Sequence, residues 1–399
     1  MLKLLLIVVA NILFLNVGHA VDILSTAENT FFRNDDPTRV GLEIEFSGLS
    51  IEKAIQIVQQ EFPVKVEIKE PEIKVLQEKV DAVVLFSGGL DSIAGLEFIK
   101  KDFKKVKYVF VNNQVPKTSK FVRQLQRDMG LGDDLIIFQT QPGGKFLQQT
   151  RGFSFLTAAY VVADIFKAEN IIISECGVTK YQPSINIADE ITKTTHPLMI
   201  TLATALFENL NLKKKVHFPF DLNTKAEIIA TVKNPNSLIN SRSCRYSNIS
   251  NELKPECGHC FGCLLKHISL VFVTGKKQNQ FLLDPITNKS DAVESNLGKE
   301  WRLTTKRYEP VMSLISFCET ILADISCLPE TTQQQLNQHG TQDLFKRHAE
   351  DMVYGLMYMK QEGLVKNEFV LKRLIKIETA VWFDAKQISI RRKRILSKK

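Results

Sequence analysis

One short string of residues carries the clearest chemical signal in this sequence. Between the apolar run 82–86 and the helically spaced residues 93–99 lies Ser87-Gly88-Gly89-Leu90-Asp91-Ser92. The apolar run is short and rich in β-branched and aromatic residues, which predicts a buried parallel strand. Glycines in a strand-to-helix turn let the backbone approach a ligand, and the helix start offers free N–H groups and a positive dipole end. With two serine hydroxyls as further donors, the string predicts a phosphate-binding loop rather than an ordinary turn.

Four of the seven cysteines provide a second signal, because they fall within twenty residues of one another. They are Cys244, Cys257, Cys260 and Cys263. Thiolates are soft ligands that suit zinc, and a C-x-x-C-x-x-C run with a fourth cysteine upstream supplies a full tetrahedral set. The alternative is a buried helix face lined by three cysteines, but Gly258 and Gly262 make that helix a poor one. We therefore expect a structural zinc site, because four protein ligands leave no position for a catalytic water.

From the phosphate-binding loop onward, strand patterns alternate with helix patterns. The expected strands cover 82–86, 107–111, 135–138 and 171–174. The expected helices cover 119–129, 153–167, 196–210 and, after a cap at Asn223 or Thr224, a segment that runs to Val232. This alternation predicts an α/β fold with a doubly wound parallel sheet, whose ligand binds at the carboxyl ends of the strands.

The length of 399 residues leaves room for other regions around this α/β domain. We expect four parts: an N-terminal accessory region, 1–79; the loop-containing domain, 80–240; a zinc-binding segment, 241–275; and a C-terminal region, 276–399. The accessory region shows a strand pattern at 40–46 and a helix pattern at 51–62. The C-terminal region shows helix patterns near 309–325, 341–361 and 366–380.

Most of the net charge of +8 belongs to the C-terminal end. Six basic residues stand in the last nine positions: Arg391, Arg392, Lys393, Arg394, Lys398 and Lys399. The rest of the chain is nearly neutral, so its charge does not indicate a body that binds nucleic acid. We interpret the basic tail as a solvated, frayed end.

The phosphate-binding loop resembles that of the PP-loop enzymes, the N-type ATP pyrophosphatases, and further pieces resemble their 7-cyano-7-deazaguanine synthase branch. These pieces are Asn113-Gln114, Thr150-Arg151-Gly152-Phe153, Leu222-Asn223-Thr224-Lys225-Ala226-Glu227 and Ser243-Cys244-Arg245, followed by the C-x-x-C-x-x-C run. The resemblance implies a Rossmann-like fold and an enzyme that cleaves ATP between the α- and β-phosphates. Such an enzyme adenylates the carboxylate of 7-carboxy-7-deazaguanine, which an amine then attacks.

The resemblance also implies a role for each matching residue. The ATP-binding loop would consist of Ser87, Gly88, Gly89, Leu90, Asp91 and Ser92. Asp91 would help to hold Mg²⁺, and Asn113 and Gln114 would lie near the adenine or ribose. Arg151 would reach the phosphates or the substrate carboxylate, and Lys225 would neutralise charge on the departing pyrophosphate. The alternative for Arg151 and Lys225 is a surface or capping role.

Some segments depart from the housekeeping synthase. Twelve residues separate Cys244 from Cys257, more than we expect for that enzyme, and 175–183 and 195–197 differ from its substrate-recognition loop. These segments look closer to synthase-like proteins of bacterial anti-phage operons, some of which pass the activated deazapurine to the N-terminal amine of a partner protein. Ammonia is the alternative acceptor and would give the nitrile precursor of queuosine. A tRNA-modifying PP-loop enzyme is a further alternative, and the intact loop argues against a non-enzymatic nucleic-acid binder.

The first twenty residues point in another direction. The start Met1-Leu2-Lys3, the apolar run 4–17 and the ending Gly18-His19-Ala20 are typical of a secretory signal peptide. The run is too short and interrupted for a transmembrane helix. We favour the alternative, a buried first strand or a strand plus helix, and predict a cytoplasmic protein, because export would separate the enzyme from ATP and reduced thiols. The oligomeric state stays open, and a dimer is compatible with the sequence.

Overall fold

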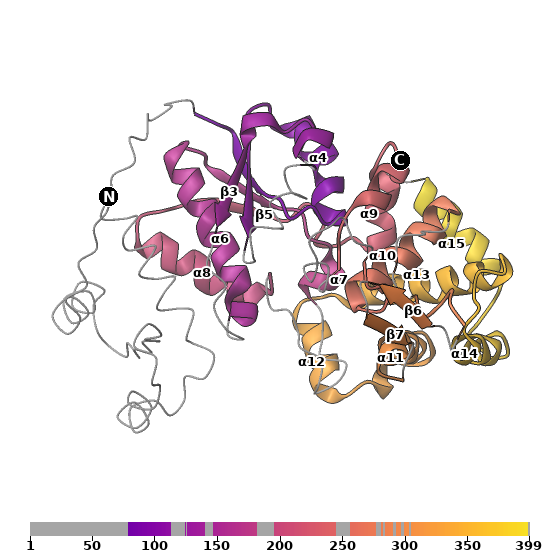
Figure 1. Cartoon of the computed structure of the whole chain (residues 1–399). Helices are drawn as coiled ribbons and strands as arrows, with labels where there is room; N and C mark the ends of the chain where they lie inside the picture. The colour runs from indigo at the N-terminus through magenta and orange to yellow at the C-terminus, as the bar shows by residue number, and fades with distance from the viewer. Residues whose placement is uncertain are drawn as a thin grey trace, which may run out of the picture.

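The structure is a computed structural model of the chain, shown in Figure 1. It describes residues 79–112, 124, 126–139, 147–181, 195–244, 256–276, 281, 284–289, 293–296, 299–302 and 305–397. The strand and helix expected at 40–46 and 51–62, and the signal-like start 1–20, lie outside these residues.

A five-stranded sheet, parallel throughout, forms one half of the described structure. Its strands are β1 (Ala82–Leu85), β2 (Val106–Asn112), β3 (Leu135–Gln139), β4 (Asn170–Ile173) and β5 (Lys215–His217). Their order is β3-β2-β1-β4-β5, so the chain starts in the middle and winds outward in both directions. The four predicted strands are confirmed, whereas the short edge strand β5 carries only three residues and was not expected.

Helices cover both faces of this sheet (Figure 1). One face packs on α4 (Leu90–Asp102) and α9 (Lys225–Thr231), and the other packs on α6 (Leu147–Ile165) and α8 (Pro197–Asn209). Successive residues of β1 alternate between the two cores, with Val84 on the α4 side and Val83 on the α6 side. Both side chains are fully buried, as in a parallel sheet covered on both faces. The predicted doubly wound α/β fold is therefore confirmed at the level of a Rossmann-like arrangement.

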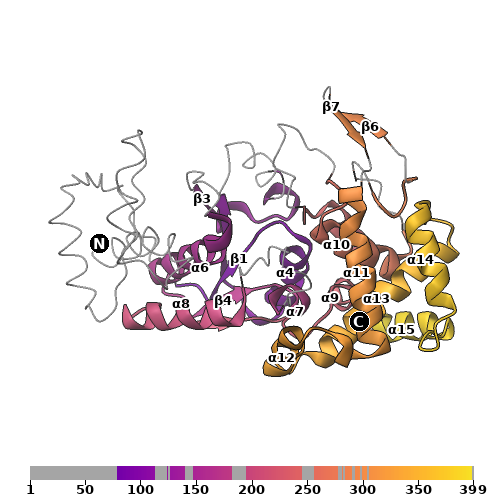
Figure 2. The ribbon, with the colours of Figure 1, turned by 90° about the horizontal axis from the view of Figure 1, so that it is seen from below.

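The C-terminal half is mainly helical, as expected, and its helices gather beside α4 and α9 (Figures 1 and 2). Its helices are α10 (Phe261–Thr274), α11 (Thr305–Ala323), α12 (Glu330–Gln338), α13 (Gln342–Gln361), α14 (Glu368–Glu378) and α15 (Lys386–Leu396). An unexpected antiparallel hairpin, β6 (Val293–Asn296) and β7 (Lys299–Arg302), lies between α10 and α11. The short helical turns within the described residues are α7 (Gly177–Lys180), η1 (Gly132–Asp134), η2 (Pro235–Asn240) and η3 (Ile325–Cys327).

Helix α13 lies at the centre of this half and packs closely on α10. A Cβ atom at Gly355 would come within 2.7 Å of Ile268 Cγ2, so glycine permits the close approach of the two helices. The apolar residues of α10, α11, α13, α14 and α15 join those of α4 and α9 in a single buried cluster. The C-terminal half is thus built onto one face of the α/β half.

The expectation of a frayed basic tail is wrong for α15 (Lys386–Leu396), and that of solvation is wrong for Arg391, whereas Lys393 and Arg394 are exposed as expected. Arg391 is only 3% exposed, and Arg392 donates a hydrogen bond to the carbonyl oxygen of Phe272 at 2.7 Å. The apolar residues Ile388 and Ile395 are spaced by seven positions, and both are buried. This spacing gives α15 an apolar face, which packs on the core and brings the buried arginine with it.

Candidate functional site

The glycine-rich string forms the turn between β1 and α4, as predicted. Gly88 has φ +72°, a conformation that favours glycine, and the Gly89 N–H donates to Ser87 Oγ at 3.2 Å. Ser92 Oγ donates to the Gly89 carbonyl oxygen at 3.0 Å and lies 3.3 Å from Ser87 Oγ. Gly89 is the N-cap residue of α4 and has no side chain to cap the helix. The first turn of α4 therefore lies at the carboxyl end of β1, and no side chain of its N-cap residue covers its N–H groups.

A distant segment of the chain supports this turn. The Arg242 N–H donates to the Gly88 carbonyl oxygen at 3.0 Å, and the Leu90 N–H donates to Ser243 Oγ at 3.5 Å. A Cβ atom on Gly89 would lie 3.2 Å from Ser87 Oγ and 3.5 Å from the Arg242 carbonyl oxygen, so a larger residue would crowd the turn. The backbone at 242–243 thus fixes the position of the loop.

Asp91 and Lys225, two predicted site residues, meet beside this turn. Lys225 Nζ lies 2.6 Å from Asp91 Oδ2, which also accepts the Cys176 N–H at 3.2 Å. The two side chains are 9% and 13% exposed. Burial opposes the charge on Lys225 and is the largest single influence on its pKa, but Asp91, Cys176 and Glu175 together outweigh it and raise the pKa of the lysine. The Lys225 ammonium therefore keeps its charge beside Asp91, and both side chains are largely shielded from water.

The first turn of α9 places Lys225. Thr224 caps the helix, because the Glu227 N–H donates to Thr224 Oγ1 at 3.2 Å and the Thr224 N–H donates to Glu227 Oε2 at 3.1 Å. The sequence predicted a cap at Asn223 or Thr224, and the structure shows that Thr224 is the cap, in a capping box with Glu227. It sets Lys225 as the first helical residue, pointing at Asp91.

Glu175 and Cys176 join the site from the end of β4. Glu175 accepts a hydrogen bond from Thr195 Oγ1, and burial raises the pKa of its carboxyl, with the Asp91 charge adding to the shift. The sequence marked 175–183 as unusual but assigned no role to Glu175. Its position in the sequence could have indicated a role, because Glu175 follows β4, the strand beside β1. The carboxyl ends of neighbouring parallel strands meet at the same edge of a sheet.

Three other predicted site residues are not brought to this place by the described structure. Arg151 lies in the second turn of α6, but its side chain is outside the described part of the chain. Asn113 and Gln114 directly follow β2 and also lie outside it. Their predicted roles therefore stay predictions.

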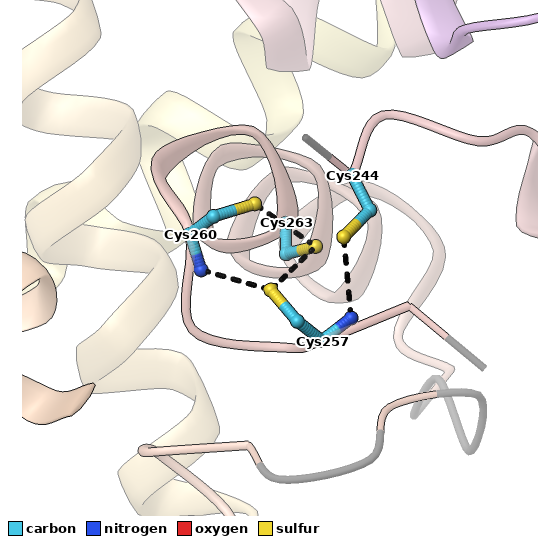
Figure 3. Close-up of side chains that lie close together, drawn as sticks. All are labelled: Cys244, Cys257, Cys260 and Cys263. Carbon is cyan, nitrogen blue, oxygen red and sulfur yellow. Dashed lines mark hydrogen bonds between the residues drawn. The ribbon is translucent and has the colours of Figure 1, made fainter. Parts of the chain in front are cut away.

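The four predicted cysteines come together as a buried cluster (Figure 3). The potential ligand atoms of Cys244, Cys257, Cys260 and Cys263 all lie within 4.8 Å of one another. Cys260 is the N-cap of α10 and Cys263 lies in its first turn, while the turn at Gly258 has φ +83°. The Cys257 N–H donates to Cys244 Sγ, and the Cys260 N–H donates to Cys257 Sγ, both at 3.3 Å. These thiols could hold a metal ion in the manner of a closed four-cysteine site.

A buried ion pair connects this cluster to the glycine-rich turn. Lys266 Nζ, on α10, lies 2.8 Å from Glu256 Oε2, and both side chains are almost fully buried. The other Glu256 oxygen, Oε1, accepts the Cys244 N–H at 2.9 Å and the Ser243 N–H at 2.5 Å. Ser243 in turn accepts from the first turn of α4. The cysteine-containing segment and the loop are thus joined through residue 243.

No helix in the described part of the chain has both the length and the apolar character to cross a membrane. Compared with models of known protein families, the chain shows no match, and compared with curated proteins it shows no significant relative in sequence.

Proposed function

We propose that this protein is an ATP-dependent ligase that adenylates a carboxylate with release of pyrophosphate. One observation carries the proposal. The first turn of α4, with its glycine-rich loop, adjoins the buried Asp91–Lys225 ion pair at the carboxyl ends of β1 and β4. Helix N-termini at this edge of a parallel sheet bind phosphate groups, and a shielded lysine stabilises charge that develops during transfer.

Each side chain then has a stated task. The N–H groups of the first turn of α4, with the hydroxyls of Ser87 and Ser92, bind the phosphates. The Lys225 ammonium stabilises negative charge on the departing pyrophosphate, and its raised pKa keeps it protonated at neutral pH. Glu175 lies beside the pair, within its electrostatic influence.

The Asp91 carboxylate fits the Mg²⁺ that accompanies ATP. Its Oδ2 is engaged by Lys225 and Cys176, whereas Oδ1 is buried and accepts no hydrogen bond from the residues that the structure describes. Carboxylate oxygens are ligands that Mg²⁺ prefers, and a carboxylate usually shares the ion with substrate phosphates. Bound there, Mg²⁺ would neutralise phosphate charge, and Asp91 would hold it.

The resemblance of the loop and cysteine motifs to 7-cyano-7-deazaguanine synthases supports the choice of carboxylate. We propose 7-carboxy-7-deazaguanine as the substrate, and the N-terminal amine of a partner protein as the acceptor in anti-phage defence. The four cysteines would bind zinc, because four closely set thiols form the preferred structural zinc site.

The proposal is tested by following AMP and pyrophosphate release. Wild-type protein with ATP, Mg²⁺ and 7-carboxy-7-deazaguanine should release both products, and Asp91→Ala should release neither. Asp102→Ala is the matched control, because Asp102 is exposed at the far end of the same helix and should leave release unchanged. Pyrophosphate release by wild-type protein that does not depend on the carboxylate would contradict the proposal.

A second experiment identifies the acceptor. Proteins encoded beside this chain are co-expressed with it, and their intact masses are measured. A mass increase equal to one acyl-linked deazaguanine, absent with Asp91→Ala, identifies a protein acceptor. Unmodified neighbours together with ammonia-dependent nitrile formation would instead assign the housekeeping reaction.

A further inference from the structure

A buried cluster of charges joins three helices behind the candidate site. Its members are Glu227 on α9, Asp351 on α13 and Arg391 on α15, which are 0%, 0% and 3% exposed. Arg391 Nε lies 2.8 Å from Asp351 Oδ1, and an Arg391 terminal nitrogen lies 3.3 Å from Glu227 Oε1. Charges so deeply buried persist only when they are paired.

Thr224 closes the cluster into a ring. Its hydroxyl donates to Asp351 Oδ2 and accepts the Glu227 N–H, while its own N–H donates to Glu227 Oε2. The capping box of α9 is therefore not only a local device. Both carboxylates that bond to Thr224, those of Glu227 and Asp351, also pair with the buried guanidinium of Arg391.

The ring ends at the residue before Lys225. Because Thr224 is the N-cap and Lys225 is the first helical residue, a displaced cap would displace the Lys225 ammonium from Asp91. Arg347 also pairs with Glu227, but its side chain is 21% exposed and its second carboxylate partner is the exposed Asp343. Arg391 is a buried cation that pairs with both Glu227 and Asp351.

We propose that Arg391 is a positioning residue, by which the C-terminal helix α15 holds the first turn of α9 and so keeps Lys225 against Asp91. The catalytic meaning of this role rests on the proposed function, whereas the positioning itself does not. Helix α15 would then complete the candidate site from the far end of the chain.

The test measures the position of Lys225 directly. Amine acylation is quantified by mass spectrometry at each lysine of the full-length protein. Lys225 is 7% exposed, so Arg391→Gln should increase its acylation about tenfold, the factor expected when a hydrogen bond between charged groups is lost. Arg391→Lys keeps a cation and should restore part of the protection of Lys225 from acylation. It takes the place of Arg391→Gln in the test if that variant does not fold.

Two controls separate positioning from general loosening. Arg392→Gln alters the next residue of α15, which contacts Phe272 and Tyr358 instead of the ring, and should leave Lys225 protected. Lys266, fully buried on α10, should stay unreactive in every variant. Wild-type acylation of Lys225 in the Arg391 variants would overturn the proposal, as would an equal rise at Lys225 and Lys266.

Activity is measured on the same samples. If wild-type protein releases no pyrophosphate, the proposed function fails, while the acylation result still decides the positioning role. If wild-type protein is active, Arg391→Gln should lower kcat in protein that retains Lys225. The same substitution should cause no further loss of kcat when it is added to a Lys225→Met variant. Independent, multiplying losses would show that Arg391 acts on folding only.

Discussion

At the scale of single residues, the central feature is an ion pair between positions that are 134 apart in the sequence. Asp91 and Lys225 are each shielded from water, and the distance between their charged atoms is 2.6 Å. A shielded pair of this kind is weak evidence for stability, because desolvation offsets the attraction. It is better explained as a preorganised charge arrangement at a binding site.

The stability of variants can separate these two views. Lys225→Met should lower the free energy of unfolding by about 3 kcal/mol, because it leaves the Asp91 charge buried without a partner. Asp91→Asn combined with Lys225→Met should recover part of that loss, since no charge remains, yet the double variant should release no pyrophosphate. Urea unfolding measures the free energy of unfolding of each variant. Additive losses in the double variant would show that the two side chains are not coupled.

A second residue-scale prediction concerns pH. His348 on α13 is 1% exposed, and burial, with the Lys225 charge as a smaller contribution, lowers its pKa from 6.5 to about 3. The unfolded chain therefore binds a proton that the folded protein excludes, so stability falls as the pH drops below the unfolded value. Between about pH 7.5 and about pH 4.5 this loss is about 3 kcal/mol, and His348→Gln should remove it.

The measurement is urea unfolding at both pH values. His217→Gln is the matched control, because His217 is exposed on β5 and should leave the loss in place. An identical pH dependence for wild type and His348→Gln would contradict the buried, neutral histidine.

At the scale of elements, α10 is organised by the cysteine cluster at its N-terminus. Cys260 caps the helix and Cys263 lies in its first turn, so an ion held there would fix where α10 begins. Through Glu256 and Ser243 the same segment reaches the first turn of α4. An ion held by the four cysteines would thus support the loop from this segment.

Metal analysis tests this element. Purified protein should contain a single zinc ion per chain, and Cys260→Ser should lose it together with several degrees of thermal stability. Cys327→Ser is the control, because Cys327 is an exposed thiol far from the cluster in sequence. A wild-type protein that contains no metal and is as stable to heat as Cys260→Ser would show that the four cysteines are ordinary core residues.

Sequence patterns and contacts contributed differently to these elements. Local patterns predicted β1 to β4, a helix cap at Asn223 or Thr224 and the four cysteines, because each depends on residues near one another in the chain. The contacts of Arg391 could not be predicted that way. The basic residues beside it suggested a solvated end. Only the packing of α15 on α9 and α13 shows that Arg391 forms ion pairs with Asp351 and Glu227.

At the scale of the whole molecule, one apolar core connects the sheet to the C-terminal helices. This core extends from Ala82 on β1 to Ile395 on α15. The loop-containing part and the C-terminal helices therefore share a single core on this face of the sheet. The C-terminal helices are structural partners of α4 and α9.

A shared core predicts cooperative unfolding. Tryptophan fluorescence reports on the C-terminal half, which holds both tryptophans, Trp301 and Trp382, and far-UV circular dichroism reports on all helices and strands. The two signals should lose native values at the same temperature. Two midpoints separated by several degrees would show that the halves unfold independently.

The central claim is that the loop and the Asp91–Lys225 pair activate a carboxylate with ATP. Isotope exchange between labelled pyrophosphate and ATP, in the absence of any amine, tests it most directly, because only reversible adenylation returns the label to ATP. Wild-type protein should incorporate label when 7-carboxy-7-deazaguanine is present, Asp102→Ala should do the same, and Lys225→Met should not. No carboxylate-dependent incorporation by the wild-type protein, or equal incorporation by Lys225→Met, would contradict this account.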